Sequence, residues 1–148
     1  MHQLSNRNYL SKPQSMVKVI IHTDTRYPVN RRVIRKAVLD TFSEFKIADA
    51  DLEVSVAVVG SRKMKDLSLK FLKDAQTHEV LAFAQEEISE STGRGFVNPP
   101  DDILRLGDIV ICWPEVLESA SREETMVDDQ LYFLSKHATE HLLGKQHE

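Results

Sequence analysis

Four short segments of the chain are rich in aliphatic and β-branched residues. They are 16–22 (MVKVIIH), 53–59 (EVSVAVV), 79–84 (EVLAFA) and 107–112 (GDIVIC). Runs of this length and composition, bounded by polar or glycine-containing stretches, predict β-strands. The last segment is apolar throughout after Asp108, which predicts a central strand.

Helical periodicity separates these strands and follows the last one. The predicted helices cover 28–45, 62–72, a stretch from 114 onwards, and about 126–143. Pro28 opens the first helix, and Ser61 is the predicted N-cap of the second. The final helix is expected to stop at Gly144, where a C-terminal glycine belongs.

The predicted order of elements is β-α-β-α-β-β-α-α. This order is typical of an α+β domain with a mixed four-stranded sheet and helices packed on it. A stretch of about 86–105, with two glycines and two prolines, separates the third and fourth strands. Loops of that length in a compact domain are usually functional or mobile.

The length of 148 residues suggests one domain, over 16–148. Residues 1–15 are polar and lack the apolar core of a secretory signal, so we expect a disordered leader. The hydrophobic share of 41% and the charged share of 28% are ordinary for a soluble globular protein. No apolar run approaches the ~18–20 residues of a membrane span, so no membrane partner is expected.

Cys112 is the only cysteine, which excludes an internal disulfide and fits a reducing, cytoplasmic location. Any transition-metal site must then be built from His, Asp and Glu. The formal net charge is −4 and the pI is near 5.9. Because nothing in the overall charge favours nucleic acid, an RNA-binding role requires a local basic surface.

Three of the six histidines lie near the end of the chain, as His137-x3-His141-x5-His147. A spacing of four places His137 and His141 one above the other on one helix face. Gly144 offers a left-handed turn that would bring His147 back toward the same point. The alternative is a solvated, histidine-rich C-terminus, but the spacing and the interleaved leucines favour a metal site.

Three imidazole nitrogens suit zinc and leave a fourth coordination position for water, as catalytic zinc sites do. We therefore expect one Zn²⁺ per chain at the C-terminal helix. The ion would lower the pKa of its water toward ~7, which makes the metal-bound water the expected nucleophile. Glu140, beside His141, is a candidate general base and is otherwise a solvated helix residue.

Two protease patterns overlap this segment, and each lacks a required part. The metzincin spacing H-x3-H-x2-G-x2-H is present, but Ala138 stands where the general-base glutamate belongs. The pattern H-x-x-E-H is also present over 137–141, but its third ligand is a glutamate far downstream, and the sequence ends at Glu148. A metalloprotease is therefore the weakest of the functions considered.

The segment 137–148 (HATEHLLGKQHE) resembles the signature H-G-x-L-H-L-x-G-x-D-H of the YbeY family, the bacterial rRNA-maturation endoribonucleases. Two upstream segments agree in order and spacing. The segment 78–83 (HEVLAF) is similar to the family's T-D-V-L-S-F strand, and 106–112 (LGDIVIC) is similar to its L-G-D-I-x-I strand. The resemblance covers most of the chain from Val17 onwards.

This resemblance implies a zinc-dependent, single-strand-specific endoribonuclease acting in 16S rRNA 3′-end maturation and ribosome quality control. It also implies a cytoplasmic location, with single-stranded rRNA and the ribosome or its small-subunit proteins as partners. The family's RNA-facing groove lies near the second predicted helix, whose basic residues are candidates for phosphate contact or else form an ordinary solvated face. These residues are Arg62, Lys63, Lys65, Lys70 and Lys73.

The chain departs from the family pattern at several positions. Ala138 replaces the signature glycine, and Glu140 stands where the family has leucine. The family's arginine upstream of the third strand falls at Leu72 without a gap, and at Lys73 after a shift of one residue. Arginine clamps a phosphate in two-point geometry, which lysine mimics only as a point charge and leucine does not mimic. Lys73 is therefore a second candidate catalytic residue.

Two functions remain open from the sequence. The first is a metal-dependent endoribonuclease built on the histidine site. The second is a non-catalytic, zinc-containing ribosome-assembly factor, which the missing arginine and the negative net charge favour. Asp108 is either a residue that orients one of the metal-binding histidines or a strand-entry residue bonded to nearby backbone.

Overall fold

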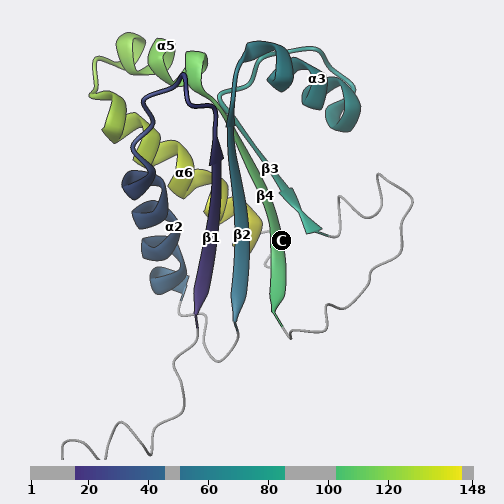
Figure 1. Ribbon diagram of the computed structural model, residues 1–148, viewed down its shortest axis with the longest axis vertical. Helices are drawn as coiled ribbons and strands as arrows, with labels where there is room; N and C mark the ends of the chain where they lie inside the picture. Colours follow the sequence, from purple (N-terminus) through teal and green to yellow (C-terminus); the bar gives the residue numbers. More distant parts are fainter. Residues whose placement is uncertain (1–15, 46–50, 86–102, 145–148) are drawn as a thin grey trace, which may run out of the picture.

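The computed structural model of the chain describes residues 16–45, 51–85 and 103–144. The predicted leader and the part of the predicted loop up to residue 102 lie outside these ranges. The elements follow in the predicted order (Figure 1). They are β1 (Val17–Thr23), α2 (Arg31–Phe45), β2 (Leu52–Val59), α3 (Ser61–Leu72), β3 (Val80–Ala84), β4 (Leu104–Cys112), α5 (Trp113–Glu123) and α6 (Val127–Gly144).

The sheet is mixed and four-stranded, as predicted, with strand order β1-β2-β4-β3. β1, β2 and β4 run parallel, while β3 pairs antiparallel with β4, so β1 and β3 are the two edges. Figure 1 shows α2 and α6 side by side, with α3 apart from them beside the upper ends of β3 and β4. No helix in the described ranges is long and apolar enough to cross a membrane.

Two hydrophobic clusters lie on opposite faces of the sheet. Alternate residues of β2, from Leu52 to Val58, are buried in the main core beneath α2, α5 and α6. The second cluster places Met64 of α3 against Phe83 and Val110 on the other face. The sheet therefore separates α6 from α3, and each helix has its own apolar contact surface.

The start of α2 differs from the prediction. The helix begins at Arg31 rather than at Pro28, because Asn30 is its N-cap. The Oδ1 atom of Asn30 accepts a hydrogen bond from the N–H of Arg32 at 3.1 Å. A side chain that satisfies a first-turn amide sets the start of the helix, and Pro28 lies in the loop before it.

Two other boundaries also differ from the prediction. Gly60 rather than Ser61 is the N-cap of α3, and it makes no side-chain capping bond. β4 begins at Leu104 rather than at Gly107, because the N–H of Leu104 donates to the carbonyl of Asp51 at 2.9 Å. Pairing with β2 therefore extends the strand into the predicted loop.

Gly107 allows the backbones of β3 and β4 to approach closely. The register between β2 and β4 shifts beside it, which indicates a β-bulge. Gly107 has φ of +152°, which side chains rarely adopt, and an added Cβ would lie 2.1 Å from the carbonyl oxygen of Phe83. The glycine of the LGDIVIC segment is thus required by the packing of two backbones.

We expect Gly107→Ala to lower the free energy of unfolding by more than ~2 kcal/mol, because relief of the collision would break β3–β4 pairing. Urea unfolding of the purified variant measures the loss. Gly144→Ala is the matched control, since a Cβ there meets nothing within 4 Å. Equal midpoints for the two variants would contradict the close-approach explanation.

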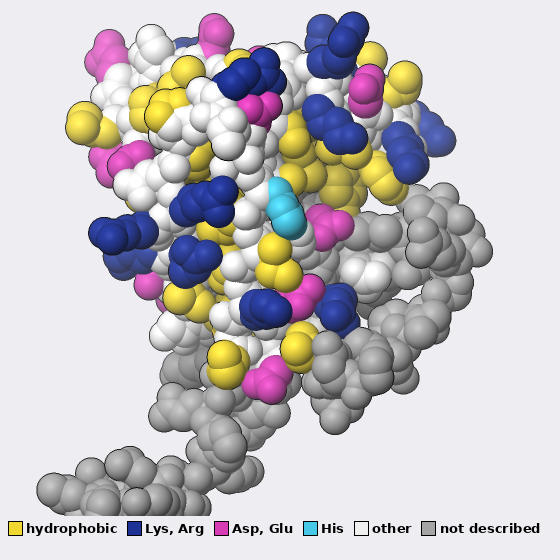
Figure 2. Space-filling view, viewed as in Figure 1, with side chains coloured by type: hydrophobic (Ala, Val, Ile, Leu, Met, Phe, Trp, Pro, Cys, Tyr) yellow, Lys and Arg dark blue, Asp and Glu magenta, His cyan; other side chains and the backbone are white. Residues whose placement is uncertain are grey.

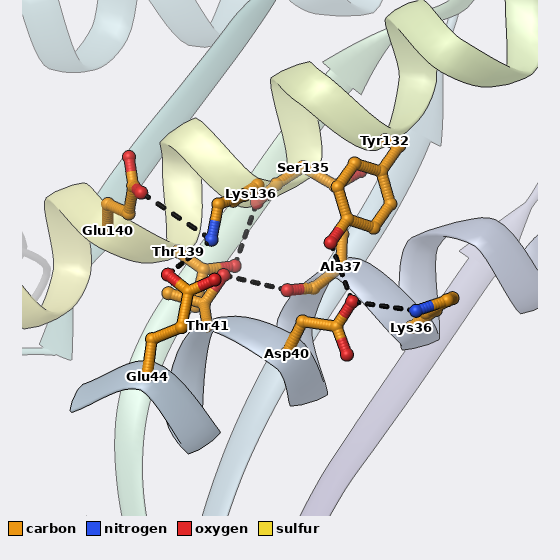
Figure 3. A network of polar contacts seen from close by, with 10 residues as sticks. All are labelled: Lys36, Ala37, Asp40, Thr41, Glu44, Tyr132, Ser135, Lys136, Thr139 and Glu140. Carbon is orange, nitrogen blue, oxygen red and sulfur yellow. Dashed lines mark hydrogen bonds and ion pairs between the residues drawn. The ribbon is translucent and has the colours of Figure 1, made fainter. Parts of the chain in front are cut away.

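A polar network joins α2 to α6 (Figure 3). The Tyr132 hydroxyl donates to Oδ2 of Asp40 at 2.6 Å, and the same oxygen accepts from Lys36 at 2.9 Å. One turn further along both helices, Lys136 Nζ donates to Glu44 Oε1 at 2.6 Å. Two charged hydrogen bonds therefore fix the axial position of α6 against α2.

The Tyr132–Asp40 hydrogen bond shifts the pKa of both groups. Both shifts favour the ionised carboxylate paired with the neutral phenol. Tyr132, followed by Lys36, lowers the pKa of Asp40 from 3.8, and Asp40 raises the pKa of Tyr132 from 10.0. The lowered carboxyl pKa contributes stability above pH 3.8 that is lost as the pH falls through the folded value. The raised phenol pKa contributes stability below pH 10.0 that is lost as the pH rises through the folded value.

Tyr132→Phe should therefore destabilise the protein at pH 7, by less than Gly107→Ala, because this bond is partly exposed to water. Urea unfolding should show the difference from the parent shrinking as the pH falls through the lowered pKa of Asp40. The control is the same substitution in an Asp40→Asn background, where it should have less effect. If Tyr132→Phe lowers the free energy of unfolding equally in both backgrounds, the bond to ionised Asp40 is not the source of that loss.

Candidate metal centre

Helix α6 carries three stripes of residues that differ in what they contact. The buried stripe faces the sheet and consists of Leu131, Leu134, Ala138 and Leu142. The flank toward α2 consists of Tyr132, Lys136 and Glu140. The opposite flank consists of Phe133, His137 and His141. Because successive helical residues point 100° apart, burial of the leucines determines where both flanks lie.

His137 and His141 line one cavity at the β3 edge of the sheet. The cavity has a volume of about 260 Å³, and its other lining residues are Leu72, Val80, Leu81, Ala82 and Ala138. Both histidines are exposed, so their imidazoles are accessible to solvent. The spacing of four therefore brings the two predicted ligands into one open cavity.

The donors in the described ranges fit part of a zinc site. Two accessible imidazoles on one helix face are ligands that zinc takes readily. Across residues 16–45, 51–85 and 103–144, however, no three His, Cys, Asp or Glu side chains gather closely enough to hold a metal ion. The predicted third ligand, His147, lies outside these residues, so the complete three-histidine site stays a prediction.

Gly144 does not provide the left-handed turn that was predicted from the sequence. It is the last residue of α6, and among the glycines in the described ranges only Gly107 has a positive φ. The helix therefore extends one residue beyond Leu143. A glycine after a helix permits a left-handed turn without requiring one.

Glu140, the candidate general base, lies on the α6 flank that faces α2. Its Oε2 atom is 3.7 Å from Lys136 Nζ (Figure 3), and it does not line the histidine cavity. The structure does not bring Glu140 together with the histidine pair. This placement fits the alternative interpretation, a solvated helix residue.

The end of α3 forms one wall of the cavity. Leu72, its last residue, lines the cavity with the histidines. Lys73 follows in the left-handed conformation, with φ of 63°, and its side chain is exposed and outside the cavity lining. Leu72 is the position at which the family arginine falls without a gap. This position therefore lines the same cavity as the histidines, and its side chain is aliphatic.

The basic residues predicted to bind RNA lie along the exposed side of α3 and just after its end, in the region where Figure 2 shows several Lys and Arg side chains. They are Arg62, Lys63, Lys65, Lys70 and Lys73. Arg62 is at the opposite end of α3 from Leu72, roughly 15 Å away by helical rise. There, with Lys63, it lines a separate cavity of about 460 Å³. Lys73 is the member of this set that directly follows a residue of the histidine cavity.

Asp108 points to the opposite face of the sheet from α6, the helix that carries His137 and His141. Ile109 belongs to the core beneath α6, whereas Val110 packs beneath α3. Asp108 alternates with Ile109 and therefore points to the α3 side. Burial, and then the charge of Glu53, raises the pKa of the Asp108 carboxyl. Asp108 is also well inside β4, so the strand-entry interpretation was wrong, and its direction separates it from His137 and His141.

Phe133 was not among the sequence-predicted site residues. It lies one helical turn before His137 on the same flank, and the two ring centroids are 6.1 Å apart with an interplanar angle of 13°. Its side chain is 58% exposed. The spacing of four that joins His137 to His141 extends back to Phe133 and is the sequence signal for it.

The fold and the site define a class of protein, an α+β domain whose last helix presents a histidine pair at the edge of a mixed sheet. The family model described as Endoribonuclease YbeY matches residues 20–148. The chain belongs to this family, which confirms the resemblance found in the three sequence segments.

Individual relatives agree with this assignment. A protein of Dehalococcoides mccartyi is 28% identical over 134 residues, covering 88% of this chain and 77% of its own length. One of Halalkalibacterium halodurans is 29% identical, with 88% and 82% covered. One of Acinetobacter baumannii is 30% identical, with 80% and 71% covered. All three are named Endoribonuclease YbeY.

A solution structure of a Thermotoga maritima protein is also similar to this chain. It has a TM-score of 0.44 and 16% sequence identity, and the match covers 89% of this chain and 92% of that one.

Proposed function

We propose that this chain is a zinc-dependent, single-strand-specific endoribonuclease that acts on ribosomal RNA in 16S 3′-end maturation and ribosome quality control. The observation that carries the proposal is the cavity shared by His137 and His141, in a chain that belongs to the Endoribonuclease YbeY family. Two solvent-accessible imidazoles at a sheet edge suit a site that must admit a polymer. Its partners would be single-stranded rRNA and small-subunit proteins, in the cytoplasm.

The chain's own residues would divide the work in the following way. His137, His141 and His147 would hold the ion, which when bound supplies Lewis acidity at the scissile phosphodiester. Lys73, at the end of α3, would place a point charge near the phosphate. The exposed cations further along α3 would bind the phosphates of the flanking strand, which makes affinity depend on salt.

A second candidate function is a non-catalytic, zinc-containing ribosome-assembly factor. The observation that favours it is Leu72, because an aliphatic side chain occupies the cavity wall at the position of the family arginine. Such a factor would bind the ribosome without cutting RNA. Its binding would survive loss of the metal if the fold survives.

Removal of one histidine tests the metal site directly. In the full-length protein, we expect about one zinc per chain and chelator-sensitive cleavage of single-stranded rRNA, and His141→Ala should lose both. Elemental analysis and a gel-based cleavage assay measure the two properties. His22→Ala is the matched control, since His22 is an exposed histidine on β1, at the opposite sheet edge.

The outcomes separate the two candidates. Cleavage by His141→Ala at the parental rate would exclude the histidine site as the catalytic centre. A zinc-loaded parent that leaves RNA intact, while it still sediments with the small subunit, would replace the nuclease with the assembly factor.

Replacement of Leu72 tests the role of the cavity wall. If the parent cuts RNA, Leu72→Arg should raise the cleavage rate by roughly tenfold, because a guanidinium can clamp the phosphate at two points. Leu72→Lys should give a smaller gain, and Leu72→Met should give none. Equal rates for all three variants would show that this wall does not contact the phosphate.

A further inference from the structure

We propose that Phe133 is a base-stacking platform that holds one nucleobase of single-stranded RNA beside the histidine cavity. This inference deepens the proposed function and rests on RNA being the substrate. The juxtaposition that carries it is an exposed phenyl ring, nearly parallel to the His137 ring, on the helix flank that continues into the cavity.

The exposed ring of Phe133 does not contribute to the packing of the fold. Its side chain is 58% exposed and belongs to neither of the two hydrophobic clusters of the described residues. Contact with His137 across one helical turn stabilises a helix by only about 0.2–0.5 kcal/mol. The ring is therefore available for a ligand, and its loss should leave the core intact.

The orientation of the ring suits a planar ligand. The Phe133 ring lies nearly parallel to the His137 ring, with an interplanar angle of 13°. An aromatic face offers every base the same π-surface, so stacking tolerates any sequence. Stacking also requires an unpaired base, which a duplex does not offer without unstacking.

The chemistry of the cavity favours a base over a phosphate at this flank. Five of the seven lining residues are aliphatic, and the two others are the histidines. An aliphatic wall does not stabilise a buried phosphate charge, whereas it contacts the apolar face of a base without loss. The scissile phosphate would lie at the histidines, and the phosphates of the flanking nucleotides would lie toward the exposed cations of α3.

A tryptophan at this position reports stacking without any cleavage. The chain has one tryptophan, Trp113, which is 5% exposed and lies in the main core. In Phe133→Trp, a second indole stands in solvent on α6. Titration of this full-length variant with a short single-stranded oligoribonucleotide, in the presence of chelator, should quench the added emission, and the matching duplex should not.

Affinity measurements on the same oligoribonucleotide complete the test. By fluorescence anisotropy, Phe133→Ala and Phe133→Leu should bind roughly five- to a hundredfold more weakly than the parent, while Phe133→Tyr should bind like it. Leu39→Ala is the control, because Leu39 is an exposed apolar residue on α2. Urea unfolding should give all these variants similar midpoints.

Specific results would overturn the proposal. Parental affinity in Phe133→Leu, or unquenched emission from Phe133→Trp at saturating RNA, would exclude stacking. Loss of small-subunit association in Phe133→Ala with unchanged RNA affinity would assign the ring to a protein contact instead. Because quenching and anisotropy report binding rather than cleavage, the test can be made even if the protein proves not to be a nuclease.

Discussion

The rotational setting of α6 about its own axis is the constraint on which the rest of the structure depends. Burial of its leucines against the sheet contributes on the order of 1.5–3 kcal/mol for each side chain. The ion pairs between α6 and α2 contribute less, because they are partly exposed and water screens them. Once that stripe is buried, the helical repeat places Tyr132 and Lys136 against α2, and His137 and His141 against β3. The polar network and the candidate site are two consequences of one packing arrangement.

The cavity also depends on the opposite side of the sheet. Its floor is β3, an edge strand of five residues that pairs only with β4 in the described ranges. Gly107 lets the two backbones meet, and Phe83 anchors β3 from beneath through its contact with α3. The glycine of the LGDIVIC segment therefore supports the site from a distance, through the position of the strand under the histidines.

Much of the fold could be predicted from the sequence, because strand composition and helical periodicity are local signals. The order of elements, the mixed sheet and the shared face of His137 and His141 all follow from them. The errors concern geometry that local pattern does not contain. The start of α2 depends on one hydrogen bond of Asn30. The direction of Asp108 depends on register in a strand that is apolar on both faces.

The residues that form the cavity wall show how the departure from the family pattern at Leu72 changes the chemistry of the candidate site. In the sequence, Leu72 is only the position at which the family arginine is missing. In the structure it forms, with Val80, Leu81, Ala82 and Ala138, an aliphatic surface around two imidazoles. Such a surface offers apolar contact rather than charge. The exposed ring of Phe133, one turn before His137, adds a further apolar surface on the same helix flank. The proposed phosphate contacts would come from the exposed cations on and just after α3, of which Lys73 directly follows Leu72 and Arg62 lies at the opposite end of the helix. In the arrangement that we propose, base contact beside this wall is separate from phosphate contact along α3.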